Sequence, residues 1–223
     1  MSEHFLGVPS GLCRRVGGGI EGCLLADAIK VAEGERIAEL GCGCGEVVVR
    51  LALAHPGVMV DGLEIQPALC AEARRLVAAH GLTGRVVVLE GDVRAAPVEM
   101  RRGGYAQVVC NPPFFVPEAG RMPVEPARAL ARFELAGGLE DFLRCGAALL
   151  QTGGWMELIH RPERLVEIFA LAKTSGLHPE RMVPIHARAG REAILVRVGL
   201  RKGGGAGLVI QEAMRVEGGV SGV

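Results

Sequence analysis

The sequence has few aromatic residues, no net charge and no long apolar run, and each absence narrows what the protein can be. Aromatic residues make up 4% of its 223 residues, so a core must be built mainly from Ala, Val and Leu. The 25 basic residues balance the 25 acidic ones, whereas proteins that coat DNA or RNA are usually strongly basic. No stretch approaches the ~18 uninterrupted apolar residues of a membrane span. With 49% hydrophobic residues, the chain is expected to form a packed core and not to enter a membrane.

Seven cysteines are scattered along the chain, an odd number. A chain of this length does not need disulfides, so we expect reduced thiols in a cytoplasmic protein. The first residues lack the basic start and apolar run of a signal peptide, which agrees with that location. The close pair Cys42 and Cys44 has no second Cys/His pair beside it and makes a poor zinc site, so no metal is expected.

Short β-branched and apolar segments alternate with segments whose apolar residues recur at helical spacing. Strands are expected at residues 36–40, 58–63, 85–89, 105–110, 155–159, 181–185 and 193–199, and helices at residues 20–32, 46–54, 67–80, 138–150 and 162–175. This alternation predicts an α/β, Rossmann-like fold: a mainly parallel seven-stranded sheet with an antiparallel end and helices on both faces. We expect one domain, with an N-terminal segment and leading helix (residues 1–35), a main part (36–217) and a flexible tail (218–223).

A Gly-rich turn, Glu-Leu-Gly-Cys-Gly-Cys-Gly at residues 39–45, lies where an open parallel sheet binds ligands, beyond the carboxyl end of a strand. Such a turn also occurs in NAD sites. Two acids end the next two strands: Glu64 can accept both hydroxyls of a ribose, and Asp92 can accept from an adenine amino group. Alternatively, Glu64 could cap the helix that starts near Pro67, and Asp92 could cap a short helix at Arg94. The pattern predicts a cofactor site made of Glu39, Gly41, Gly43, Gly45, Glu64, Asp92 and Val93.

The turn Asn-Pro-Pro-Phe directly follows the fourth expected strand, and its chemistry suits an amino group on a flat ring. Two prolines make the turn rigid and leave its carbonyl groups free to face a ligand. The Asn111 side chain and the Pro112 carbonyl can each accept one hydrogen of an amine, which aims the nitrogen lone pair at an electrophile. Phe114 can stack on the ring. The candidate catalytic residues are Asn111, Pro112, Pro113 and Phe114; alternatively, the turn only ends a strand and buries a Phe.

Together, the Gly-rich turn, Glu64, Asp92 and the Asn-Pro-Pro-Phe turn resemble class I S-adenosylmethionine-dependent methyltransferases that methylate amino groups. More narrowly, the chain is similar to the tRNA (adenine-N6) methyltransferase family that modifies the anticodon loop of a valine tRNA. Further likenesses lie at residues 21–26, 131–134, 139–143, 161–165 and 201–204. The chain departs from the family at Glu21, where Asp is usual, and at residues 17–19, where aromatic residues are usual.

The resemblance implies S-adenosylmethionine as cofactor and methylation of an exocyclic amine, adenine N6 in tRNA or another structured RNA. Alternatives are an rRNA guanine-N2 methyltransferase, a protein glutamine-N5 methyltransferase, or a domain that binds S-adenosylmethionine or RNA without catalysis. An NAD oxidoreductase would leave the Asn-Pro-Pro-Phe turn unexplained. Because the net charge is zero, RNA binding must depend on a local basic patch, with candidates Arg161, Arg164, Arg188, Arg191, Arg201 and Lys202.

Overall fold

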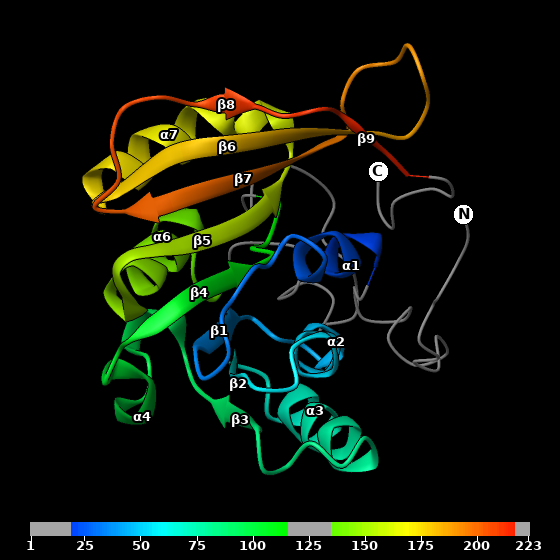
Figure 1. The fold of residues 1–223 in the computed structure, drawn as a ribbon, viewed down its shortest axis with the longest axis vertical. Helices are drawn as coiled ribbons and strands as arrows, with labels where there is room; N and C mark the ends of the chain where they lie inside the picture. Colours follow the sequence, from blue (N-terminus) through cyan, green and yellow to red (C-terminus); the bar gives the residue numbers. More distant parts are fainter. Residues whose placement is uncertain (1–18, 116–134, 217–223) are drawn as a thin grey trace.

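A single nine-stranded sheet forms the centre of the computed structural model, which describes residues 19–115 and 135–216 (Figure 1). The strands are β1 (Arg36–Leu40), β2 (Met59–Glu64), β3 (Val86–Glu90), β4 (Tyr105–Cys110), β5 (Leu150–His160), β6 (Leu177–His186), β7 (Leu195–Lys202), β8 (Val209–Ile210) and β9 (Met214–Arg215). Their order is β3-β2-β1-β4-β5-β7-β6-β8, with β9 also pairing with β6. The strands β1 to β5 run parallel, and β7 is antiparallel to both of its neighbours. This confirms the predicted fold class, to which β8 and β9 add two very short strands.

Helices cover both faces of the sheet, as expected for parallel strands that are buried on both sides. They are α1 (Ile20–Ala26), α2 (Glu46–Ala54), α3 (Pro67–Ala79), α4 (Val98–Arg101), α6 (Leu139–Leu149) and α7 (Leu165–Thr174), with the 3-10 turns η2 (Val93–Ala95) and η4 (Pro162–Arg164). Alternate residues of β1 belong to different cores. Ile37 packs with residues of α2 and α3, whereas Ala38 and Leu40 pack with residues of α4, α6 and α7.

A third core cluster links α1 to the antiparallel end of the sheet. Leu24 and Leu25 of α1 pack with Ile159 of β5, with residues of β6 and β7, and with Val216. Two of these side chains come from the start of the described chain and one from its last described residue. The leading helix and the segment around β9 therefore share one core.

The strand order reverses between β1 and β4, because β2 and β3 lie on one side of β1 and β4 and β5 on the other. At such a switch point, the loops that leave the two central strands diverge and open a crevice at the carboxyl edge of the sheet. The Gly-rich turn leaves β1 there, and the Asn-Pro-Pro-Phe turn leaves β4.

Several sequence-based boundaries need correction. The leading helix ends at Ala26, capped by Asp27, six residues before its predicted end. The strands β5, β6 and β7 are longer than expected, because backbone pairing continues past their apolar centres.

Cys44 is disulfide-bonded, so the expectation that all cysteines are reduced thiols is wrong for this residue. The predicted tail at residues 218–223 and the family likeness at residues 131–134 lie outside the described residues.

Candidate functional site

The register of the sheet brings the predicted site residues to one edge. Leu40 of β1 lies level with Leu63 of β2 on one side and with Cys110 of β4 on the other. The next residue along each strand is therefore Gly41, Glu64 or Asn111. Three predicted residues, far apart in the sequence, thus stand side by side at the carboxyl edge of the switch point.

The Gly-rich turn folds back onto β2. The N–H groups of Gly41 and Cys42 both donate to the Leu63 carbonyl, at 2.8 and 2.9 Å. Gly43 has φ of +54° and faces open space where a side chain would stand. Gly45 has φ of +89°, and a Cβ there would come within 2.9 Å of the Ala73 Cβ. The turn therefore needs Gly45 for packing, whereas Gly43 leaves room for a ligand against the backbone.

Glu39 is the last buried charge before this turn. Its side chain is only 5% exposed, and its Oε2 atom has no hydrogen-bond partner among the described residues. Burial, followed by the nearby negative charge of Glu64, raises the pKa of Glu39 well above its usual value, and the Val48 N–H in the first turn of α2 partly opposes this. A buried acceptor without a partner suits a ligand that brings its own donor and positive charge, such as an ammonium group.

Glu64 holds the turn from the neighbouring strand. Its two carboxylate oxygens accept the N–H groups of Gly43 and Gln66, each at 2.9 Å. Gln66 is itself the N-cap residue of α3, which has no side-chain cap. Glu64 thus fixes the backbone that follows β1 and the backbone that follows β2, and does not cap the first turn of α3. Each oxygen keeps a lone pair, so the carboxylate can still accept ribose hydroxyls.

Asp92 is the N-cap of η2, as one of the two sequence interpretations predicted. Its side chain accepts the Arg94 N–H at 2.8 Å and forms an ion pair with the Arg94 guanidinium at 2.5 Å. The hydrogen bonds from Arg94 lower the pKa of Asp92, so it is a carboxylate near neutral pH. The Gly91 N–H donates to the Glu64 carbonyl at 2.9 Å, which places Asp92 next to Glu64 along the edge.

The Asn-Pro-Pro-Phe turn presents an acceptor that nothing in the described chain satisfies. The Asn111 Oδ1 atom is buried and has no hydrogen-bond partner among the described residues. Pro112 is buried, and Phe114 is half-buried against the cluster that contains α1. Since a buried, unpaired amide oxygen is unfavourable, this geometry suits a ligand that supplies an N–H donor.

His160 is part of this site, although sequence analysis did not include it. Its ring centroid lies 5.2 Å from that of Phe114, and the side chain is fully buried. Arg94, which forms an ion pair with Asp92, was also not among the predicted site residues. One signal for His160 was available: it ends the strand that follows the Asn-Pro-Pro-Phe turn, and strands joined by a helical crossover usually lie near each other.

The structure divides the predicted RNA-binding residues into two groups. Arg161, Arg164, Arg188 and Arg191 follow the ends of β5 and β6 and lie at the carboxyl edge with the site. Arg201 and Lys202 end the antiparallel strand β7 and lie at the opposite edge (Figure 1). Lys202 donates to the Leu150 carbonyl at 2.7 Å, a role within the fold. The predicted patch is therefore not one surface.

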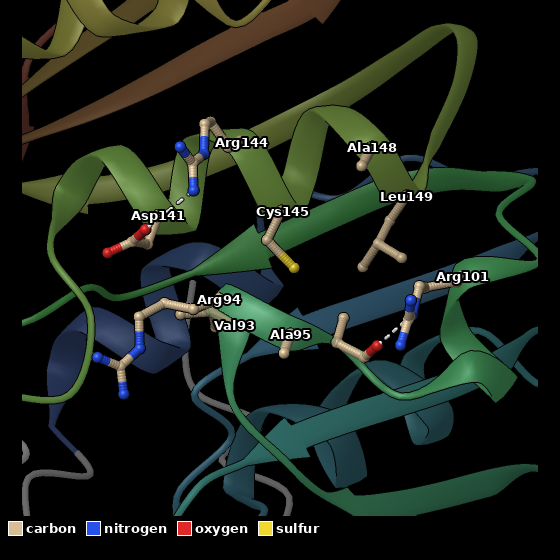
Figure 2. A pocket seen from close by; sticks show the side chains of 10 residues that line it. Val93, Arg94, Ala95, Arg101, Asp141, Arg144, Cys145, Ala148 and Leu149 are labelled. Atoms are coloured by element: carbon tan, nitrogen blue, oxygen red, sulfur yellow. Dashed lines mark hydrogen bonds and ion pairs between the residues drawn. The ribbon is translucent and has the colours of Figure 1, made fainter.

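A cavity of about 360 Å³ lies between η2 and α6 (Figure 2). Among the predicted site residues, only Val93 lines it. Its charged rim is internally paired: Arg144 contacts Asp141 at 3.3 Å, and Arg101 donates to the Ala96 carbonyl at 2.6 Å. The cavity thus adjoins the turn that Asp92 caps.

In residues 19–115 and 135–216, no group of three or more His, Cys, Asp or Glu side chains could hold a metal ion. No helix in these ranges is long and apolar enough to cross a bilayer.

Comparison with known proteins agrees with this geometry. The family model described as "Methyltransferase small domain" matches residues 20–127. A tRNA1(Val) (adenine(37)-N6)-methyltransferase from Aeromonas hydrophila is 32% identical over 186 residues, covering 81% of this chain and 75% of the relative. The protein of the same name from Aeromonas salmonicida is 31% identical over 189 residues, covering 83% and 76%.

Solved structures show the same fold. A predicted O-methyltransferase from Agrobacterium tumefaciens superimposes with a TM-score of 0.70 at 25% identity, covering 87% of this chain and 86% of that one. A geranyl diphosphate C-methyltransferase from Streptomyces coelicolor, solved with S-adenosyl-L-homocysteine, gives a TM-score of 0.60 at 13% identity, covering 82% and 78%.

Proposed function

This chain belongs to the S-adenosylmethionine-dependent methyltransferases of the methyltransferase small-domain family, and from that premise we propose that it methylates an exocyclic amino nitrogen, N6 of an adenine in a tRNA. The observation that carries the proposal is the buried Asn111 Oδ1 directly after β4, which has no hydrogen-bond partner among the described residues. We further propose that it acts in the cytoplasm, where tRNA occurs.

The residues at the crevice fit S-adenosylmethionine, which is the cofactor of this family. We propose that Glu39 accepts the ammonium group, because its buried Oε2 has no hydrogen-bond partner in the part of the chain that the structure describes. Glu64 would hold the ribose hydroxyls, Asp92 the adenine amino group and the Val93 N–H a ring nitrogen. The open face of Gly43 leaves space for the methionine part. When bound, S-adenosylmethionine supplies an activated methyl group on a sulfonium sulfur.

The chain's own contribution to methyl transfer is to orient a weak nucleophile. The lone pair of an aryl amine is delocalised into its ring, so the nitrogen attacks poorly while it remains planar. Asn111 Oδ1 accepts one N–H and the Pro112 carbonyl accepts the other, which turns the lone pair out of the ring plane. Phe114 stacks on the ring that carries the amine. No general base is required before transfer, because the amine can lose its proton afterwards.

Two observations support an RNA substrate. Two relatives, 32% and 31% identical over about three quarters of their own length, are named for adenine-N6 methylation of a tRNA. In addition, four arginines stand at the same edge of the sheet as Asn111, and two of them, Arg188 and Arg191, are exposed in the loop between β6 and β7. Arg161 and Arg164 form ion pairs with Glu163 and Glu167, so the exposed pair Arg188 and Arg191 is the part of this edge that suits a phosphate backbone.

The decisive experiment is single-turnover methyl transfer to unmodified tRNA, followed by nucleoside mass spectrometry. We expect N6-methyladenosine. Asn111→Ala should bind the cofactor as the parent does but react ~10²–10³ times more slowly, because one preorganised acceptor is lost at the reacting centre. Asn111→Asp keeps an acceptor, and its charge stabilises the positive charge that develops on nitrogen, so part of the activity should remain.

Each outcome has a distinct meaning. Full activity in Asn111→Ala would refute the orienting role. A methylated guanine or a methylated protein glutamine would keep that role and replace the substrate. Phe114→Tyr should be nearly silent, whereas Phe114→Ala should weaken substrate binding by ~1–3 kcal/mol through lost stacking.

The RNA face can be tested by two matched pairs of substitutions. Removing Arg188 and Arg191 together should weaken tRNA binding and flatten its salt dependence, because each lost phosphate contact lowers the log–log slope by about one. Removing Arg201 and Lys202, at the opposite edge, removes the same charge and should leave the slope unchanged. Equal effects of the two pairs would show that overall charge, and not this edge, governs binding.

A further inference from the structure

The register of the sheet places His160 beside the Asn-Pro-Pro-Phe turn. Leu158 of β5 pairs with Cys110, the last residue of β4. His160, two residues further along β5, therefore stands level with Pro112 in the Asn-Pro-Pro-Phe turn. Its imidazole is fully buried and lies 5.2 Å from the Phe114 ring, at 58° between the ring planes. The side chain thus packs directly against the turn that would hold the substrate amine.

The hydrogen bonds of His160 determine where its proton lies. Nδ1 accepts the Arg161 N–H at 2.8 Å, so the neutral ring carries its proton on Nε2. Burial, assisted by the positive charge of Arg164, lowers the pKa of His160 to about 4, so the ring is neutral at physiological pH. The Nε2–H group is consequently a fixed donor on a neutral ring.

This donor has no satisfied hydrogen bond in the described part of the chain, although the Pro113 carbonyl lies close enough to affect the titration of the ring. A buried N–H without a partner is costly, and a small shift of the turn would remove that cost. A hydrogen bond from the Nε2–H group to the Pro113 carbonyl would fix both the Phe114 ring and the carbonyl groups that precede it in the turn.

We propose that His160 is a positioning residue for amine methylation: its Nε2–H holds the Pro113 carbonyl, and thereby keeps Asn111 and Phe114 in the reactive arrangement. The inference rests on the proposed function, because it presumes that the turn orients an amine. His160 does not touch the reacting atoms and takes no proton from the substrate.

Two amide substitutions separate the donor at Nε2 from the acceptor at Nδ1. His160→Gln places an amide N–H near the position of Nε2, whereas His160→Asn keeps an oxygen near Nδ1 for the Arg161 N–H and lacks the distant donor. We expect His160→Asn to slow single-turnover methyl transfer ~10²-fold, the effect of a misplacement of about 1 Å. His160→Gln should recover most of that loss. Cofactor affinity, measured by calorimetry, should stay within about twofold of the parent in both, and His178→Asn, at the far end of β6, should match the parent.

The outcomes distinguish this inference from the proposed function. A parent-like rate in His160→Asn, or equal losses in two folded variants that bind cofactor normally, would overturn the positioning role. Product identity tests the proposed function separately, because the ratio of the two variants can be measured on any amine that the parent methylates. Nitrogen NMR of the parent at pH 7 provides a readout without activity: a proton on Nε2 is expected, and a proton on Nδ1 would refute the inference.

Discussion

Glu39 should release a proton when the cofactor binds. In the free protein, burial and the charge of Glu64 raise the pKa of Glu39 well above 4.5, so its carboxyl group retains a proton at pH values where an exposed Glu is ionised. An ammonium group placed against Oε2 would favour the carboxylate and reverse that shift. Up to one proton per cofactor should leave, and the logarithm of the affinity should rise with pH with a slope of up to about one.

Calorimetry in two buffers of different ionisation enthalpy counts these protons directly. The parent should release more protons than Glu39→Gln at pH values between 4.5 and the raised pKa, and the difference should vanish above it. Glu39→Gln should also lose about 1.5–3 kcal/mol of affinity, the range of a hydrogen bond to a charged group. Taking the difference between parent and variant removes the titration of the cofactor's own amino group.

Stability provides an independent check on the same residue. Because the folded-state pKa of Glu39 lies above its unfolded value, its contribution to stability is fully present below pH 4.5 and is lost as pH rises through the folded-state pKa. The stability of the Glu39→Gln protein relative to that of the parent should therefore rise as pH increases. Equal proton release by the two proteins, with parallel stability curves, would refute the assignment of Glu39.

Three further outcomes are expected. Glu64→Ala should cost ~1–3 kcal/mol of cofactor affinity by calorimetry, and more than Glu64→Gln, because the Gly43 N–H and the ribose lose their acceptor. Asp92→Asn should weaken the binding of S-adenosylmethionine and S-adenosylhomocysteine equally, since both carry the adenine. A loss confined to one of them would refute the contact of Asp92 with the adenine. Arg94→Ala leaves the carboxylate in place and should weaken binding less. The folded-state pKa of His160, about 4, lies below its unfolded value of 6.5. As pH falls from 7.5 to 4, the free energy of unfolding of the parent, measured with urea, should therefore fall by about 3 kcal/mol relative to that of His160→Asn. A difference that stays constant with pH would contradict a buried neutral ring.

The sequence predicted the parallel half of the fold closely and the antiparallel end less well. In β1 and β4, every residue except Arg36 is buried and a turn follows at once, so the predicted and observed limits coincide. In β6, Pro179, Glu180 and Arg181 interrupt the apolar pattern, yet pairing with β7 continues through a bulge. Tertiary pairing decided those limits, and local composition could not reveal it.

The candidate site followed the same division. Glu39, Glu64 and Asn111 could be chosen because each lies at, or next to, the end of a strand that was recognisable from sequence. The role of Arg94 depends on the turn that Asp92 caps, and the place of His160 depends on the register between β4 and β5. Neither the geometry of a turn nor the register between two strands can be derived from a single sequence before the fold is known.

The order of strands at the antiparallel end has a consequence for how the protein is made. The strand β7 lies between β5 and β6, so β6 has no neighbour in the main sheet until the residues of β7 have been synthesised. The core cluster that packs on Phe114 also includes Val216 and Met214. On the ribosome, the nascent chain would therefore fold the cofactor half first, and the turn around Asn111 would gain its full support only after residue 216 has emerged. A stalled or shortened translation product would bind cofactor before it could methylate anything.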